Sequence, residues 1–178
     1  MVSKVFRQLL SDQISKQFDS CLDPRIRAYR TRHSCERTLI SLIEAWKSAC
    51  DNQRTVKILS TDLSKAFHSL HPSLMISKLK SYGFHDELRD LLRSYLCDRL
   101  NRVKLGAFRS EWKRSDRGCP QGSALGSLLW NIFQNDLTYV ITSHLSIYAD
   151  DHQMYETAGD PKMANTNLMR NAIARLTT

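Results

Sequence analysis

The sequence has no hydrophobic run that approaches the roughly 18 apolar residues of a membrane-spanning helix. Charged residues interrupt its N-terminal region, unlike in a secretory signal peptide. It also has no low-complexity tract and no internal repeat, and its hydrophobic fraction of 42% favours a packed core over disorder. We therefore expect one globular unit located inside the cell.

Paired cysteine motifs are also missing. The chain has five cysteines, an odd number, with no C-x-x-C pair and no histidine at zinc-finger spacing from them. We therefore expect reduced thiols that hold no zinc, at Cys21, Cys35, Cys50, Cys97 and Cys119.

Acidic residues are scarce in two segments. The whole chain has 26 Lys and Arg against 18 Asp and Glu, a net charge of +8. Residues 25–37 contain five arginines and one acid, and residues 99–117 contain seven basic residues and two acids. A basic segment often forms only a solvated face, but two local clusters indicate a nucleic-acid backbone as a partner.

Apolar periodicity predicts a mixed order of helices and strands. Helices are expected at residues 3–18, 34–50, 72–82, 86–97, 127–141 and 161–176. Strands are expected at 55–62, 145–149 and 152–155, with a β-ribbon formed by residues 102–105 and 111–113. This order is typical of an α+β fold in which a small antiparallel sheet carries helices on one face.

Three carboxylates stand at the expected strand ends. Asp62 ends the first strand, and Asp150 and Asp151 occupy the tip of the later hairpin. Carboxylates are the protein ligands that Mg²⁺ prefers. Two such ions about 4 Å apart activate an attacking hydroxyl and stabilise a leaving pyrophosphate. Each acid taken alone is equally well explained as a turn residue.

The residues around the acids form three motifs. They are Thr61-Asp62-Leu63-Ser64-Lys65-Ala66-Phe67, the segment Arg117-Gly118-Cys119-Pro120-Gln121-Gly122-Ser123-Ala124-Leu125-Gly126, and Tyr148-Ala149-Asp150-Asp151. In order and spacing they resemble the palm motifs of reverse transcriptases from non-LTR (LINE-type) retrotransposons. Residues 30–36 resemble the fingers segment that precedes the palm, and residues 128–137 continue the second motif.

The resemblance implies an α+β polymerase palm whose small antiparallel sheet is backed by helices, with partial helical fingers at residues 1–54 and the palm at 55–178. It implies an RNA-directed DNA polymerase acting on an RNA template, a DNA primer and deoxynucleoside triphosphates, with a nuclear site of action. Asp62, Asp150 and Asp151 would hold two Mg²⁺ ions, or Mn²⁺ in their place, with the backbone carbonyl of Leu63 as an extra ligand.

The resemblance also assigns nucleotide-binding residues. Phe67 would be the steric gate that clashes with a ribonucleotide 2′-hydroxyl. Gln121 and Gly122 would line the incoming nucleotide and the template base, and Arg30 would grip the triphosphate through its planar guanidinium. Simpler interpretations remain open: Phe67 as a core residue, Gln121 and Gly122 as a turn, and Arg30 as a solvated charge.

Two departures from the family pattern are His68, where an aspartate is frequent, and Ser127, where a proline is usual. The chain is also expected to omit the primer grip, thumb and endonuclease. Without them a primer is not held at the reacting distance of about 3 to 3.5 Å. An inactive remnant that keeps the palm fold and binds nucleic acid is therefore an alternative. A nuclease or cyclase-like enzyme would account for the acids but not for Pro120-Gln121-Gly122 or Phe67.

Overall fold

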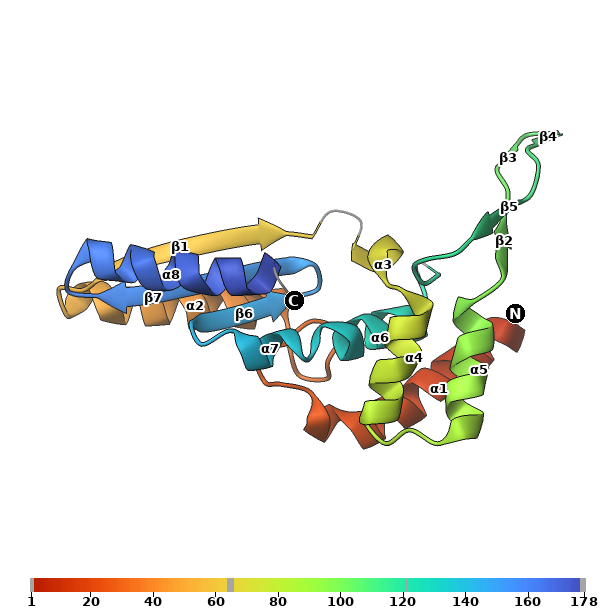
Figure 1. Cartoon of the computed structure of the whole chain (residues 1–178), viewed down its shortest axis with the longest axis horizontal. Coiled ribbons are helices and arrows are strands. Elements are labelled where there is room, and N and C mark those ends of the chain that lie inside the picture. Colours follow the sequence, from red (N-terminus) through yellow and green to blue (C-terminus); the bar gives the residue numbers. More distant parts are fainter. Residues whose placement is uncertain (1, 64–65, 121, 177–178) are drawn as a thin grey trace.

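The computed structural model describes residues 2–63, 66–120 and 122–176. Figure 1 shows an elongated molecule with a small sheet and two long helices at one end, a helical group at the other, and a β-ribbon projecting from that group. Within the described residues, no helix is both long and apolar enough to cross a membrane.

The sheet has three antiparallel strands, in the order β1 (Thr55–Asp62), β7 (Asp151–Ala158) and β6 (His144–Tyr148). β1 ends at the predicted residue because β-branched and apolar side chains fill it and a carboxylate closes it. The register places Asp62 opposite Asp151, and Tyr148 opposite Asp151 on the other side of β7. The central strand therefore brings the first and third motifs to one end of the sheet.

Helices cover both faces of this sheet. Met154 belongs to a buried cluster with Leu168 of α8 (Pro161–Leu176), while the ring of its neighbour Tyr155 lies 6.1 Å from Trp46 of α2 (Cys35–Asp51). Successive strand residues point to opposite faces, so α8 and α2 lie on opposite sides. Figure 1 shows α8 in front of the sheet and α2 behind it. The expectation of one covered face is wrong, because side chains of β7 pack against helices on both faces.

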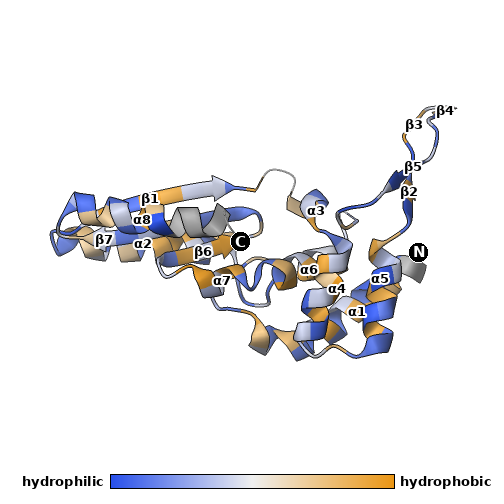
Figure 2. Ribbon diagram, in the orientation of Figure 1, coloured by the Kyte–Doolittle hydropathy of each residue, from blue (hydrophilic) through white to orange (hydrophobic). Residues whose placement is uncertain are grey.

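The helical group has a core of its own. It is built by α1 (Val2–Phe18), α4 (Pro72–Ser81), α5 (Asp86–Leu96) and α6 (Ala124–Gln134), whose apolar side chains form one buried cluster. Figure 2 shows hydrophobic residues concentrated along α6 and β6 and hydrophilic ones on the outer surfaces of α5 and α2. Because α1 packs here and α2 packs on the sheet, the predicted segments 1–54 and 55–178 interleave. Their assignment to fingers and palm stays a prediction.

Short elements complete the chain: η1 (Asp19–Cys21), α3 (Ala66–Ser69), α7 (Leu137–Val140), β2 (Arg99–Asn101), β3 (Lys104–Leu105), β4 (Phe108–Arg109) and β5 (Lys113–Ser115). β2 pairs with β5 and β3 with β4, so a ribbon forms in the predicted region. Its strands differ from those expected, because residues 102–103 and 111–112 lie outside them.

The helix expected over residues 127–141 is interrupted. α6 ends at Gln134 and α7 begins at Leu137. The carbonyl of Asn135 accepts from the Thr138 hydroxyl at 2.7 Å and from the Thr138 amide at 3.3 Å, so the backbone tightens to a three-residue spacing. The Asn135 side chain meanwhile binds Tyr82 and the chain at Cys21 and Asp23. The apolar pattern of the sequence cannot predict this break, because it depends on hydrogen bonds of the polar residues Asn135 and Thr138.

Leu79 tests the helical core. It is fully buried in α4, whereas Leu74 of the same helix is 48% exposed. We expect Leu79→Ala to lower the free energy of unfolding by about 2 to 5 kcal/mol, because it leaves a cavity. Leu74→Ala is expected to change it by less than about 0.5 kcal/mol. Urea denaturation followed by circular dichroism measures both, and equal effects would contradict the assignment of Leu79 to a packed core.

Candidate active site

The three acids meet at one end of the sheet. Asp62 and Asp151 face each other across β1 and β7, and the amide of Leu63 donates to the Asp150 carbonyl at 3.2 Å. Directly opposed residues in an antiparallel pair have Cα atoms about 4.5 to 5.5 Å apart and side chains on the same face. The fold therefore brings together the backbone positions of acids that lie almost ninety residues apart in the chain.

The turn between β6 and β7 differs in detail from the expected hairpin tip. Asp151 is the first residue of β7, so only Ala149 and Asp150 form the turn. Ala149 has a φ of 59°, in the left-handed region that costs a residue with a Cβ roughly 1 to 2 kcal/mol. Asp150 is half-buried, and Asp62 and Asp151 are exposed. The strained turn thus presents one acid while the strand presents the next.

The donor set suits a hard divalent cation. Like charges directly opposite each other in a sheet destabilise it, and Asp62 and Asp151 are such a pair. Within the described part of the chain none of the three acids forms a salt bridge that would offset the repulsion. Among those same residues no three acidic, His or Cys side chains converge on a metal-binding geometry. The metal-binding role of the acids therefore stays a prediction that rests on their chemistry and backbone positions.

Leu63 was predicted to add a carbonyl ligand. That carbonyl accepts a hydrogen bond from the Ala66 amide at 3.0 Å, while the Leu63 amide is bound to Asp150. A carbonyl oxygen has two lone pairs, so one remains for a further partner.

α6 carries a positioning residue that the motif analysis did not single out. The indole nitrogen of Trp130 donates to the Ala149 carbonyl at 3.0 Å, and both residues are buried. This bond holds the strained residue of the acid-bearing turn. The sequence shows only that Trp130 directly follows the apolar pair Leu128-Leu129 in the helix after the second motif.

A chain of buried polar side chains links the strand after this turn to α6. Gln134 of α6 bonds the ring of His152 in β7 at 3.1 Å and donates to the Asn131 amide oxygen at 3.3 Å. Asn131 in turn donates to the Ala28 carbonyl at 2.7 Å. All three side chains are buried, so each bond is shielded from water. α6 therefore links the acid-bearing hairpin to the loop at residues 22–34.

Phe67 lies in a group of aromatic rings beside this turn. Its half-buried ring is 5.6 Å from Trp130 and 6.3 Å from Tyr29. Partial burial raises the pKa of Tyr29, and the negative charge of Asp150 raises it further, so Tyr29 lies within electrostatic reach of that acid. The structure thus places Phe67 beside Trp130 and Tyr29, and Tyr29 is a neighbour that the motifs did not indicate.

The second motif docks directly on the Phe67 segment. The Gly118 amide donates to Leu70 at 2.7 Å, and the Cys119 amide donates to the Phe67 carbonyl at 2.9 Å. Gly118 has a φ of +80°, and a Cβ there would lie 2.7 Å from the Phe67 carbonyl oxygen. Only glycine allows this approach. Gly122, with a φ of +72°, faces open space, and Gln121 lies outside the described residues.

Arg30 is engaged elsewhere. Its side chain is 11% exposed, and its guanidinium pairs with the Asp19 carboxylate at 2.9 Å. The same group donates to the carbonyls of Asp23 and Ile26 at 3.1 Å and of Asp19 at 3.3 Å. The observed role of Arg30 is to brace the chain after α1, and a grip on a triphosphate would require these bonds to break.

Comparison with known proteins gives one family. The family model described as "Reverse transcriptase (RNA-dependent DNA polymerase)" matches residues 1–175. A Drosophila melanogaster protein named "Probable RNA-directed DNA polymerase from transposon BS" is 28% identical over 163 residues, which cover 84% of this chain and 18% of that protein. The "RNA-directed DNA polymerase from mobile element jockey" of the same organism is 26% identical over 61% of this chain and 12% of its own length. This chain therefore spans less than a fifth of these relatives.

Solved structures share the fold. A telomerase from Candida albicans, in complex with a TWJ fragment of telomeric RNA, matches with a TM-score of 0.60 and 14% identity over 93% of this chain and 32% of its own. An apo telomerase from Candida tropicalis matches with a TM-score of 0.55 and 12% identity over 94% of this chain and 35% of its own. The expected α+β class, with a small antiparallel sheet backed by helices, is confirmed.

Trp130→Phe tests the support of the turn. The change leaves the buried Ala149 carbonyl without its donor, so we expect the free energy of unfolding to fall by about 1 to 3 kcal/mol. Trp112→Phe is the matched control, because Trp112 is 57% exposed and is expected to change stability by less than about 0.5 kcal/mol. Denaturant titrations of both variants decide the point, and equal stabilities would show that the indole bond supports nothing.

Arg30→Ala separates a brace from a phosphate ligand. Loss of the four guanidinium hydrogen bonds is expected to lower the free energy of unfolding by about 1 to 3 kcal/mol. Arg170→Ala on the exposed side of α8 is expected to have little effect. Thermal unfolding measures both. Unchanged stability together with weakened deoxynucleotide binding would instead restore the triphosphate role.

Proposed function

Because the chain belongs to the reverse transcriptase family, we propose that it forms part of an RNA-directed DNA polymerase of a LINE-type mobile element. The predicted family resemblance is thereby confirmed, and the activity is our proposal. The observation that carries it is the pairing of Asp62 with Asp151 across adjacent strands, with Asp150 in the intervening turn. A nuclease using the same acids would account for Asp62, Asp150 and Asp151, but it would not account for the contact between the second motif and the Phe67 segment.

The family generally uses divalent metal ions, and we assign two Mg²⁺ ions, replaceable by Mn²⁺, to Asp62, Asp150, Asp151 and the Leu63 carbonyl. When bound, such ions lower the barrier to attack by a hydroxyl on a nucleoside triphosphate and neutralise the leaving pyrophosphate. The protein contributes a rigid frame: β1 and β7 fix the spacing of Asp62 and Asp151, and Trp130 fixes the turn. Two strands hold carboxylates with less freedom than loops would.

For the nucleotide, we assign the space beside Phe67 to the sugar. The ring packs against Trp130, so it is backed by a buried side chain and cannot withdraw from a 2′-hydroxyl. Discrimination against ribonucleotides would follow from that clash. Gln121 and Gly122 remain assigned to the incoming nucleotide and the template base, and Arg30 would contribute only if it were released from Asp19 and the loop carbonyls.

The partners follow from the same assignment. We propose an RNA template, a DNA primer and deoxynucleoside triphosphates as substrates, with residues 1–54 acting as fingers, residues 55–178 acting as palm, and a nuclear site of action. The uncompensated positive charge of the chain, net +8, suits a polyanionic partner.

Primer extension tests the acids. In a longer protein that adds the C-terminal segments of the relatives, we expect extension of a DNA primer on an RNA template to require Mg²⁺. Asp150→Ala is expected to reduce the rate by at least about 10²-fold, because a ligand of the reacting ions is lost.

Asp90→Ala is the matched control, since Asp90 is an exposed acid on α5 that pairs with Arg93. Extension that survives Asp150→Ala would overturn the metal assignment. If the 178-residue chain alone extends no primer while the longer protein does, the missing function lies in primer positioning rather than in the acids.

A further inference from the structure

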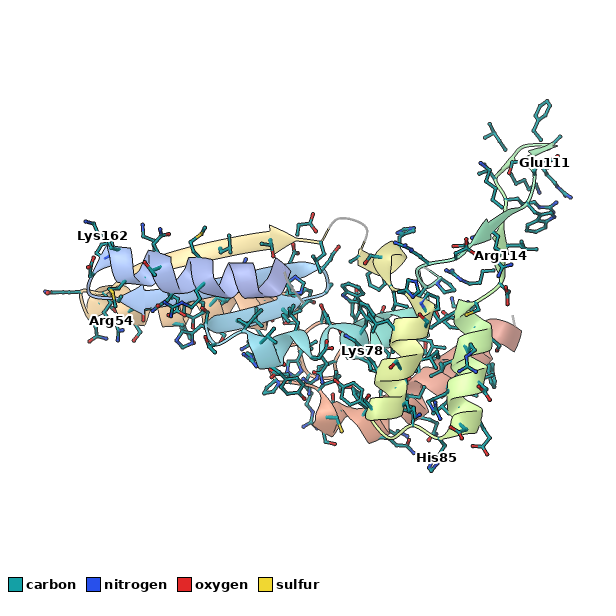
Figure 3. All side chains as sticks on the ribbon, viewed as in Figure 1. Arg54, Lys78, His85, Glu111, Arg114 and Lys162 are labelled. Atoms are coloured by element: carbon teal, nitrogen blue, oxygen red, sulfur yellow. The ribbon has the colours of Figure 1, made fainter. Side chains whose placement is uncertain are left out.

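The basic ribbon, residues 99–115, stands away from both cores. Figure 3 shows it projecting from the helical group, with Arg114 near its base and Glu111 near its tip. Arg99 anchors the base: its guanidinium donates to the carbonyls of Arg117 and Gly118 at 2.7 Å and of Leu96 at 3.1 Å. Gly118 also donates its amide to Leu70, next to the Phe67 segment. Gly118 therefore contacts both the base of the ribbon and the residues that follow Phe67.

The tip of the ribbon has an apolar face that nothing in the described chain covers. The register puts Leu105 opposite Phe108, so both side chains lie on one face. Leu105 is 78% exposed, Phe108 is 83% exposed and the nearby Val103 is 71% exposed. Large apolar side chains that are exposed side by side mark a surface for another molecule rather than a folding core.

The opposite face of the tip is basic. Lys104 lies opposite Arg109, and within the described residues neither forms a salt bridge. Arg102 lies over the Trp112 ring, 4.4 Å from its centre, so a cation and an aromatic face are already stacked. At the base, by contrast, Arg114 is neutralised by Asp98 and Asp116. The tip therefore carries three cations, Arg102, Lys104 and Arg109, that form no salt bridge within the described residues, beside the single acid Glu111.

We propose that the basic ribbon binds single-stranded nucleic acid that crosses its narrow tip, with unpaired bases stacked on Phe108 and on the face of Trp112 that Arg102 leaves open, and with phosphates held by Lys104 and Arg109 on the opposite face. Exposed aromatic rings beside uncompensated cations are the pattern that binds single strands without sequence preference. A duplex keeps its bases stacked on one another and offers these rings no face. The cations argue against a purely apolar protein partner. The inference deepens the proposed function, because the ribbon would hold a strand leading to the acids.

The test measures binding alone, in EDTA and without nucleotides, so it is independent of polymerase activity. Fluorescence anisotropy of the 178-residue chain with labelled fifteen-residue oligomers of uridine and of thymidine gives the affinities for RNA and DNA. Phe108→Ala and Trp112→Ala are each expected to weaken binding about tenfold. The double change Lys104→Ala with Arg109→Ala is expected to weaken binding and to lower the slope of log affinity against log salt by about 1.4.

Two exposed positions far from the ribbon serve as controls. Tyr139, 71% exposed on α7, matches the aromatic changes, and Lys162 at the opposite end of the molecule in Figure 3 matches the basic ones. Both alanine variants are expected to bind as the parent does. Losses in the uridine series support the proposal with RNA as the ligand, and losses in the thymidine series support it with DNA.

Affinities of Phe108→Ala and Trp112→Ala within twofold of the parent for both oligomers would overturn the proposal. So would a duplex of the same length that binds as tightly as the single strands. Circular dichroism is used to check that each variant is folded. We expect all of them to fold, because the substituted side chains are exposed.

Discussion

The arrangement of the site depends on the contact between α6 and the turn that carries the acids. Ala149 adopts a left-handed backbone conformation that an alanine does not favour, and the buried indole of Trp130 binds its carbonyl there. Without the indole, the Ala149 carbonyl would be buried with no hydrogen-bond donor, and this would add to the cost of the left-handed conformation. The Trp130 bond therefore stabilises the turn in its strained form. Asp150 and Asp151 take their positions from that turn, and Asp62 follows through the pairing of β1 with β7.

α6 can provide this support because it belongs to both parts of the molecule. Its apolar side packs in the helical core through Leu125 and Leu129, while Gln134 reaches His152 in the sheet. Asn135, just past its end, closes the break before α7. A rigid helix of this kind transmits the packing of one core to the acid-bearing turn on the other.

The ribbon, the second motif and Phe67 form a second chain of contacts. Arg99 holds Gly118, and Gly118 approaches the Phe67 carbonyl at a distance that excludes a side chain. A ligand held on Phe108 and Trp112 would therefore be connected mechanically to Phe67, for which we propose the role of steric gate. Exposed aromatic rings favour aggregation unless another molecule covers them. The proposed single-stranded ligand would cover Phe108 and Trp112.

Local sequence was sufficient for the elements whose residues carry strong signals: Asp62 at a strand end, Pro72 at a helix start, and the acids beside a hairpin, all placed to within a residue. The motifs also identified the family, because order and spacing survive in sequence. The covering of both sheet faces, the break at Asn135 and the bracing role of Arg30 were not predictable. Each depends on hydrogen bonds or packing between residues far apart in the chain, and those partners are chosen only when the two cores assemble.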